Sequence, residues 1–537
     1  MTDLRTLAAG VLCVGFDGTQ IDNALEERLR ALPLAGLILF ARNIKSLAQT
    51  RALTDRIRAL FPNPIVAIDQ EGGRVARLRD GVEELPAMMA LAATGDLSLA
   101  RDAGAQLGFD LRRAGLNVDF APVLDLALFP MNTVIGGRSF GDDPLRVAEF
   151  AGAFAQGLRL QGMVPTFKHF PGHGATAVDS HLDLPVIELD EATLRGRDLV
   201  PFAQLLPDAE ALMTAHIIVR SLDPDRPATI SPRNLTDLLR NELGFQGVCF
   251  TDCMQMDAIA NGIGSAPGAV EALVAGADCV LISHSIDIAA ESVDRIVDAV
   301  RSGYLSEERL QEAYERVAAL RSSLKAPLAL DAPAPHPGIG REIGKRAVTL
   351  IRGDAHADPA RSIVLTFEGT TVEGVQGLHS EHATLPSPQP LEELRLPLDP
   401  QQSDVDAALA ELKEMQKRPI VLMRRAHVYA KQFAAVEQVL CAFPDALVVS
   451  TREPFDALSL ASAKHLLCTY GDDAPSLAGL ADIIFSDTPP TGNLPLSHAK
   501  APPNCHAEAS PDCHAEASPN CHAEVSKHPE ESKGPPG

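Results

Sequence analysis

The chain has no tryptophan, and aromatic residues make up only 4% of its 537 residues. It also has no apolar run near the roughly 20 residues that a membrane-spanning helix needs. Positive charge is scarce, since 47 Lys and Arg stand against 71 Asp and Glu, a formal net charge of −24. Nucleic acids and anionic membranes are bound through clustered Lys and Arg. We therefore expect neither as a partner, and a small-molecule substrate instead.

The rest of the composition, 46% hydrophobic and 22% charged residues, is typical of a soluble globular protein. The length exceeds the roughly 250–300 residues of a single hydrophobic core, which predicts two domains. The N-terminal apolar run is short and lies between Asp3 and Asp17, so it is a poor signal peptide. Most cysteines are scattered among apolar residues, as is typical of reduced thiols. These features predict a cytoplasmic protein.

Short β-branched runs alternate with amphipathic segments along the first 300 residues. The expected strands are residues 10–16, 36–40, 64–70, 117–125, 164–170, 211–219, 247–252 and 278–284. Helical spacing of apolar residues marks segments 46–61, 98–115, 145–162 and 231–244 between them. Eight such strands predict a parallel (β/α)₈ TIM-type barrel, with a doubly wound open sheet as the alternative.

Polar residues follow these runs where the expected strands end. They are Asp69, Asp125, Lys168 with His169, His216 and Asp252. Catalytic groups of TIM-type barrels lie at the carboxyl ends of the strands. A structural core alone would not require this placement, so the barrel prediction and the polar residues support each other.

After the barrel, the sequence predicts a linker, a second domain and a tail. We expect a catalytic barrel over 1–325, a Pro- and Ala-rich linker over 326–340, a smaller α/β sandwich domain over 341–497 and a disordered low-complexity tail over 498–537. The tail repeats Cys-His pairs every eight residues. Adjacent Cys and His differ from the separated ligands of zinc sites, and no apolar residues surround them. We therefore expect no metal and no cofactor.

The segment KHFPGHGATAVDSHLDLP, residues 168–185, concentrates polar residue types of catalysis. One interpretation is zinc held by His169, His173 and His181, although no Glu or Cys ligand lies nearby. A second is ordinary loop polarity. A third is a dyad in which the Asp179 carboxylate orients His181 and raises its basicity, which gives a proton donor and acceptor near neutral pH. The mixture of Lys, His and Asp at a barrel mouth favours the dyad.

Asp252 directly follows the apolar run VCF, which makes it a candidate nucleophile at a strand end. Around a Gly-Gly turn, Asp69 stands with Arg74 and Arg77, and Arg138 follows another glycine pair. Carboxylates and guanidinium groups hold sugar hydroxyls and amides through charge-assisted hydrogen bonds. The same residues also form ordinary salt bridges, and both interpretations stay open from spacing alone.

The motifs IDQEGGRVARL, NVDFAPVLDL, GGRSFG, KHFPGHG with D-S-H, and FTD-x-x-x-M occur in this order over residues 1–320. Together they resemble the bacterial β-N-acetylglucosaminidases (β-hexosaminidases) of glycoside hydrolase family 3, in the two-domain type. The resemblance implies a retaining, exo-acting hydrolase of terminal β-linked GlcNAc. It implies that Asp252 is the nucleophile and that His181, with Asp179, is the general acid and base. Most retaining glycosidases use a second carboxylic acid there.

The resemblance also implies sugar-binding roles for Asp69, Arg77, Arg138, Lys168 and His169. It implies a carbohydrate substrate, namely GlcNAc-containing muropeptides from cell-wall recycling. Two other activities stay open: phosphorolysis, because a His acid/base repels phosphate less than a carboxylate would, and the β-glucosidase or β-xylosidase activity of other family 3 members. A sugar-binding scaffold without activity would be expected to lack Asp252 or His181.

Overall fold

The computed structural model describes residues 3–176, 184–369, 371–373, 377–379 and 384–497. Eight parallel strands close into a barrel in the order β1-β10-β9-β7-β5-β4-β3-β2. These strands are β1 Leu12–Val14, β2 Gly36–Leu39, β3 Ile65–Ile68, β4 Val118–Asp119, β5 Val164–Phe170, β7 Ala211–Thr214, β9 Val248–Cys253 and β10 Cys279–Ile282. The barrel is thus closed, and the open-sheet alternative is wrong.

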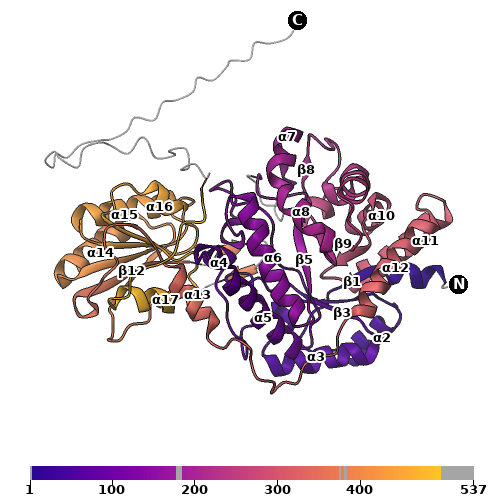
Figure 1. The fold of residues 1–537 in the computed structure, drawn as a ribbon, viewed down its shortest axis with the longest axis horizontal. Coiled ribbons are helices and arrows are strands. Elements are labelled where there is room, and N and C mark those ends of the chain that lie inside the picture. Colours follow the sequence, from indigo (N-terminus) through magenta and orange to yellow (C-terminus); the bar gives the residue numbers. More distant parts are fainter. Residues whose placement is uncertain (1–2, 177–183, 370, 374–376, 380–383, 498–537) are drawn as a thin grey trace, which may run out of the picture. The chain divides into compact units, whose positions relative to one another are not determined.

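Helices surround the barrel in indigo to salmon colours (Figure 1). They are α1 Leu4–Ala9, α2 Asn23–Arg30, α3 Leu47–Leu60, α4 Met88–Ala93, α5 Leu97–Arg113, α6 Pro144–Leu160, α7 Glu191–Thr193, α8 Val200–Leu205, α9 Asp257–Ala260, α10 Ser265–Ala275, α11 Ile286–Arg301 and α12 Glu307–Ser323. Shorter 3₁₀ or π turns are η1 Ala41–Asn43, η2 Gly136–Arg138, η3 Leu194–Asp198, η4 Leu206–Asp208, η5 Ala228–Ile230 and η6 Arg233–Glu242. The four helical segments expected from the sequence therefore all form, the last as a π-helix.

Two apolar runs are only partly strand. The run 117–125 pairs as β4 over two residues only, with an isolated bridge from Val123 to Lys168 further on. Between them, Pro122 has no N–H to donate to a neighbouring strand. The run 211–219 divides into β7 and a separate strand, β8 Ile218–Val219, which pairs with β6 Val186–Ile187 outside the barrel. The expected strands 117–125 and 211–219 were therefore too long.

The seam between the first and last strands of the barrel depends on a glycine. β1 pairs with β10 over residues 12–14 and 280–282. A Cβ at Gly15, just past β1, would lie 1.8 Å from the Ser283 carbonyl oxygen. Only a residue without a side chain lets these two strand ends approach so closely.

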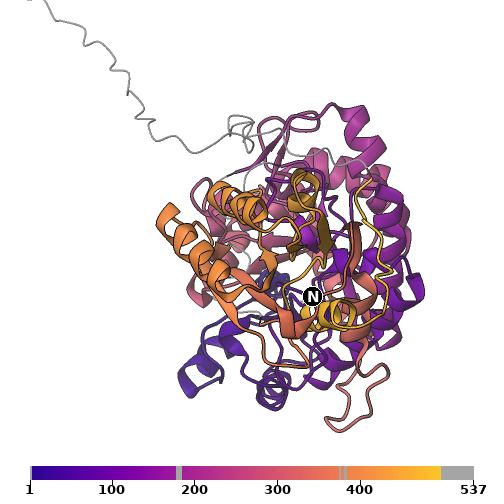
Figure 2. The ribbon, with the colours of Figure 1, turned by 90° about the vertical axis from the view of Figure 1, so that its left-hand side faces the viewer.

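A second sheet follows the barrel, in orange and yellow in Figures 1 and 2. Its order is β11-β18-β17-β16-β12-β15, parallel except for β11. The strands are β11 Thr349–Arg352, β12 Ser362–Glu368, β15 Glu393–Pro397, β16 Arg418–Met423, β17 Leu447–Ser450 and β18 His465–Cys468, with a β13 Thr371–Glu373 and β14 Gly377–His379 pair apart. Its helices are α13 Ile339–Ala347, the turn η7 Pro359–Arg361, α14 Gln402–Met415, α15 Ala430–Ala442, α16 Phe455–Ser459 and α17 Ala474–Ile484.

The barrel and this sheet belong to one compact unit. The mixed α/β class, a barrel followed by a smaller α/β sheet, is confirmed. The domain boundaries given above stay a prediction, and residues 498–537 lie outside the described residues. In the described part of the chain, no helix is long and apolar enough to cross a membrane.

Candidate active site

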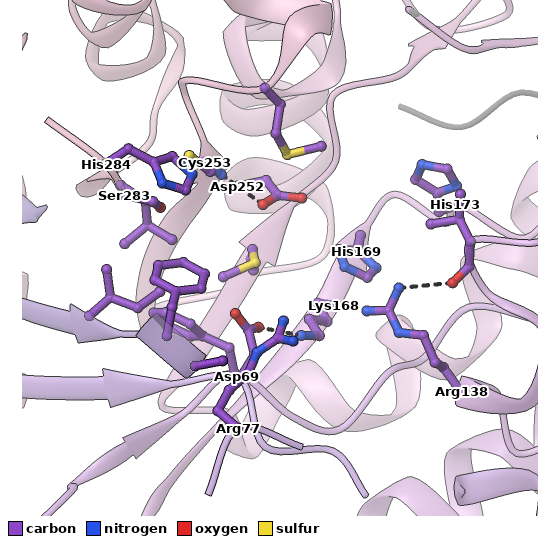
Figure 3. Close-up of a pocket in the computed structure, with 18 of the residues that line it drawn as sticks. Asp69, Arg77, Arg138, Lys168, His169, His173, Asp252, Cys253, Ser283 and His284 are labelled. Atoms are coloured by element: carbon purple, nitrogen blue, oxygen red, sulfur yellow. Dashed lines mark hydrogen bonds and ion pairs between the residues drawn. The ribbon is translucent and has the colours of Figure 1, made fainter. Parts of the chain in front are cut away.

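A cavity of about 380 Å³ lies at the carboxyl ends of the barrel strands (Figure 3). Six of the residues predicted from the sequence line it: Asp69, Arg77, Arg138, Lys168, His169 and Asp252. They come from the ends of β3, β5 and β9 and from the segments after β3 and β4. Residues up to 183 positions apart in the chain, from Asp69 to Asp252, thus meet because parallel strands of a barrel end on one face.

A buried carboxylate, Glu71, organises the cations of the cavity floor. Arg138 donates to it twice, from Nε to Oε2 and from Nη2 to Oε1, each at 2.8 Å. Lys168 Nζ lies 2.6 Å from Glu71 Oε1 and 2.8 Å from Asp69 Oδ1. The Glu71 side chain is 1% exposed. Charge-assisted contacts of this kind fix both cations in orientation.

In this network, opposite charges keep one another ionised although burial favours the neutral forms. Burial raises the pKa of Glu71, but Arg138 and Lys168 outweigh it and hold that pKa well below the ordinary value. Burial lowers the pKa of Lys168, yet Asp69 and Glu71 outweigh it, so the pKa is raised. Asp119, fully buried beneath them, has a pKa raised well above the ordinary value by burial. The network is therefore ionised at neutral pH, while Asp119 favours the protonated form.

His169 is oriented by Asp125, the residue that ends the fourth expected run. Its Nδ1 lies 2.6 Å from Asp125 Oδ2, which leaves Nε2 for the cavity. The backbone N–H of His173 donates to Asp125 Oδ1 at 2.6 Å. Burial raises the pKa of Asp125, but His169 and His173 outweigh it and lower the pKa. One carboxylate therefore holds both His169 and His173, the two ends of the turn after Lys168.

Asp252 lies near the end of β9 and is half-buried, so one side meets the cavity. The Cys253 N–H donates to Asp252 Oδ1 at 2.7 Å. The next carbonyl, that of Cys253, lies 2.9 Å from Nε2 of His216, whose Nδ1 lies 2.8 Å from Thr229 Oγ1. A buried imidazole at the end of β7 thus holds the strand end that carries Asp252.

The rim of the cavity carries an aromatic pair that the sequence did not single out. The rings of Phe40 and His284 stack with centroids 5.7 Å apart, and the Arg42 guanidinium lies 4.7 Å from the Phe40 centroid. Arg42 is paired with Asp17 at 2.9 Å. Burial, followed by the Arg42 charge, lowers the pKa of His284, so its ring is neutral at neutral pH.

Two predicted residues, Asp179 and His181, lie outside the described residues, so the dyad stays a prediction. Glu71 was missed although it stands in the quoted motif IDQEGGR. The usable signal was its place two residues after Asp69 at a strand end. Its partners Arg138 and Lys168 come from distant segments, and no spacing rule reveals such pairs. Among the described residues, no three His, Cys, Asp or Glu are grouped so that they could hold a metal ion.

A closed parallel barrel with carboxylates and cations at its carboxyl face is the architecture of many glycoside-cleaving enzymes. Residues 4–320 match the model of the glycosyl hydrolase family 3 N-terminal domain. The chain therefore belongs to glycosyl hydrolase family 3, and the resemblance seen in the sequence is confirmed at this level.

Individual relatives of this chain support the same family assignment. A β-hexosaminidase of Pseudomonas aeruginosa (strain LESB58) is 42% identical over 292 residues, 53% of this chain and 87% of the relative. One of Stenotrophomonas maltophilia (strain R551-3) is 40% identical over 305 residues, 55% of this chain and 88% of the relative. The structure of a family 3 β-N-acetylglucosaminidase from Paenibacillus sp. str. FPU-7 superposes with a TM-score of 0.86 at 30% identity, over 93% of this chain and 99% of that chain.

Proposed function

We propose that this protein is a retaining exo-β-N-acetylglucosaminidase that removes terminal β-linked GlcNAc by double displacement. The observation that carries the proposal is the shared cavity. Asp252 faces the same 380 Å³ space as Asp69, Arg77, Lys168 and His169. Similarity to β-hexosaminidases supports a hexosaminide over a glucoside.

The charge balance of the cavity favours a neutral sugar. Lys168 and Arg138 are already paired with Asp69 and Glu71. The cavity floor therefore offers both hydrogen-bond donors and acceptors, and these pairs add no net positive charge. Sugar hydroxyls both donate and accept, and therefore use carboxylates and cations together. An incoming phosphate would need uncompensated cations, so the pairing argues for water as the acceptor.

In the proposed mechanism Asp252 attacks the anomeric carbon, and the leaving oxygen takes a proton from His181. A glycosyl-enzyme ester forms as the glycosidic bond breaks. His181 then removes a proton from water, which attacks the same carbon and releases Asp252. Asp179 orients His181 in both steps. Asp69, Arg77, Arg138, Lys168 and His169 hold the sugar hydroxyls.

We further propose a cellular role. The natural substrates would be muropeptides in which GlcNAc is linked to anhydro-N-acetylmuramic acid, and the place of action the cytoplasm, as turnover of imported cell-wall fragments requires. The family resemblance supports this role. An assay with purified muropeptides tests it directly: GlcNAc is released if the role is right, and intact muropeptides remain if it is wrong.

The activity is tested with aryl β-N-acetylglucosaminide and aryl β-glucoside, each with and without inorganic phosphate. We expect cleavage of the first, with the β-anomer as initial product by NMR. Equal rates on both substrates would contradict the substrate assignment, an initial α-anomer would contradict retention, and GlcNAc-1-phosphate would indicate a phosphorylase.

The nucleophile is tested by Asp252→Asn, which should lower kcat by several orders of magnitude because no ester can form. Asp257→Asn is the matched control, an exposed aspartate five residues away. A 5-fluoro-GlcNAc donor, which slows the second step, should label the peptide that contains Asp252. A label on another residue would reassign the nucleophile.

A further inference from the structure

The segment 132–139 lies between the proposed sugar site and the second sheet. On the cavity side it ends in η2, whose Arg138 lines the pocket and holds Glu71. Arg138 Nη1 also donates to the Val134 carbonyl at 3.0 Å (Figure 3). At its start, Asn132 Nδ2 donates to the His173 carbonyl at 3.0 Å. The segment thus touches both the sugar-binding arginine and the KHFPGH turn.

The other side of this segment is covered by residues that follow β17 and β18. A Cβ at Gly136 would lie 2.5 Å from Glu453 Oε1, and one at Gly137 would lie 3.5 Å from the Tyr470 carbonyl oxygen. Gly136 has a φ of +44°, which favours glycine. The Glu453 carboxylate therefore packs directly against the backbone of η2.

Glu453 is itself held firmly. It is 3% exposed and lies at the carboxyl end of the second sheet, three residues beyond β17. The Ser450 hydroxyl donates to its carbonyl at 2.8 Å. Its Oε2 lies 3.9 Å from Nε of the buried Arg425, beyond β16. The backbone at Glu453 is thus fixed to the end of β17, and its buried carboxylate lies between Arg425 and Gly136.

We propose that Glu453 is a positioning residue for Arg138, through which the second sheet sets the geometry of the sugar site. The inference rests on the sugar-binding role proposed for Arg138. The segment between β4 and α6 has no regular structure except η2 and contains two adjacent glycines, whose backbone is freer than that of other residues. Arg74 Nη2 holds the segment from the barrel side, at the carbonyls of Thr133 and Val134, and the Glu453 carboxylate restricts its other side. A displacement of about 1 Å at a binding group can cost up to about 100-fold in rate.

The test compares Glu453→Ala, Glu453→Gln and the exposed-site control Glu392→Ala, all in the full-length protein. We expect Glu453→Ala to raise KM for the aryl β-N-acetylglucosaminide and the inhibition constant of GlcNAc about tenfold, with kcat changed less than threefold. Glu453→Gln keeps the shape of the side chain and should restore most of the affinity. Glu392→Ala should match the unaltered protein. Unchanged KM and inhibition constant in Glu453→Ala would overturn the proposal.

Hydrogen exchange gives a readout that needs no substrate. Peptides covering 132–139 should exchange at least fivefold faster in Glu453→Ala, while peptides covering β3 and β9 keep their rates. Faster exchange across the whole barrel, or none in 132–139, would overturn the positioning role. If Glu453→Ala does not fold, Glu453→Asp, which withdraws the carboxylate by one methylene, is measured in the same way. An unaltered protein without glycosidase activity would refute the proposed function, while the exchange rates would still decide the packing role.

Discussion

Arg138 and Glu71 form a two-point ion pair, with both donor–acceptor distances at 2.8 Å, between two buried side chains. The two residues are 67 positions apart in the chain and come from the segments after β3 and β4. Since Lys168 shares the same carboxylate, one glutamate fixes two cations that face the cavity. Glu71 therefore orients the cations of the proposed sugar site without lining the cavity.

Glu71→Gln should both destabilise the fold and weaken binding. Removing one partner of a buried ion pair leaves uncompensated charge and costs about 3–5 kcal/mol. Chemical denaturation measures this loss, and GlcNAc inhibition should weaken in parallel. Glu291→Gln removes an exposed carboxylate paired with Arg295 and should leave the denaturation midpoint unchanged. A Glu71→Gln protein of unaltered stability would contradict the buried network.

Stability should fall as the pH is lowered from 6.5 to 4, partly through His173. Burial lowers its pKa from 6.5 to about 4, despite the nearby Asp125 carboxylate. Between these values the unfolded chain binds a proton that the native protein does not, so stability rises with pH in this window. The contribution is at most about 3 kcal/mol. In the His173→Gln variant, the urea midpoint should depend less steeply on pH between 4 and 6.5. An equally steep profile in the variant would assign the dependence to other groups.

His216→Ala should lower kcat more than it changes KM. Its ring holds the Cys253 carbonyl, next to Asp252, and displacing the proposed nucleophile should slow its reaction with bound substrate. We expect a decrease in kcat of about 10- to 100-fold, with KM within threefold. Steady-state kinetics of His216→Ala beside His336→Ala, a half-buried histidine far along the chain, checks this. Equal kcat values in the two variants would contradict the positioning role.

Gly15→Ala should destabilise the barrel because the new methyl group meets the Ser283 carbonyl. Overpacking of this kind costs about 1–3 kcal/mol or more. Gly196→Ala is the matched control, since a Cβ there meets nothing within 4 Å. In its helical turn, alanine should be neutral or stabilising by less than about 1 kcal/mol. Similar melting temperatures for the two variants would show that the seam tolerates a side chain.

Much of this architecture could be predicted because its signals are local. The alternation of apolar runs and helical periods indicated eight barrel strands, and polar residues after those runs indicated which face carries the site. Asp69, Lys168 and Asp252 were found in this way. Strand ends were less predictable: in 117–125 the apolar pattern continues past Pro122, where pairing is interrupted.

The parts that escaped prediction depend on partners far apart in the chain. From the sequence alone a glutamate such as Glu71 is expected at the surface, whereas in the fold it is buried and paired with Arg138 and Lys168. The stacking of Phe40 on His284 joins residues 244 positions apart. Burial and long-range pairing determine these roles, and the local spacing of residues in the sequence predicts neither.

The seam between β1 and β10 also constrains how the chain is made. β1 is synthesised first, but its partner Cys279–Ile282 is the last strand of the barrel. Until that strand leaves the ribosome, β1 and β9 present open edges that can pair with other chains. β1 must therefore wait for its last partner while the residues between Val14 and Cys279, about half of the 537-residue chain, are translated. During this interval the unclosed barrel is exposed to aggregation and to chaperones.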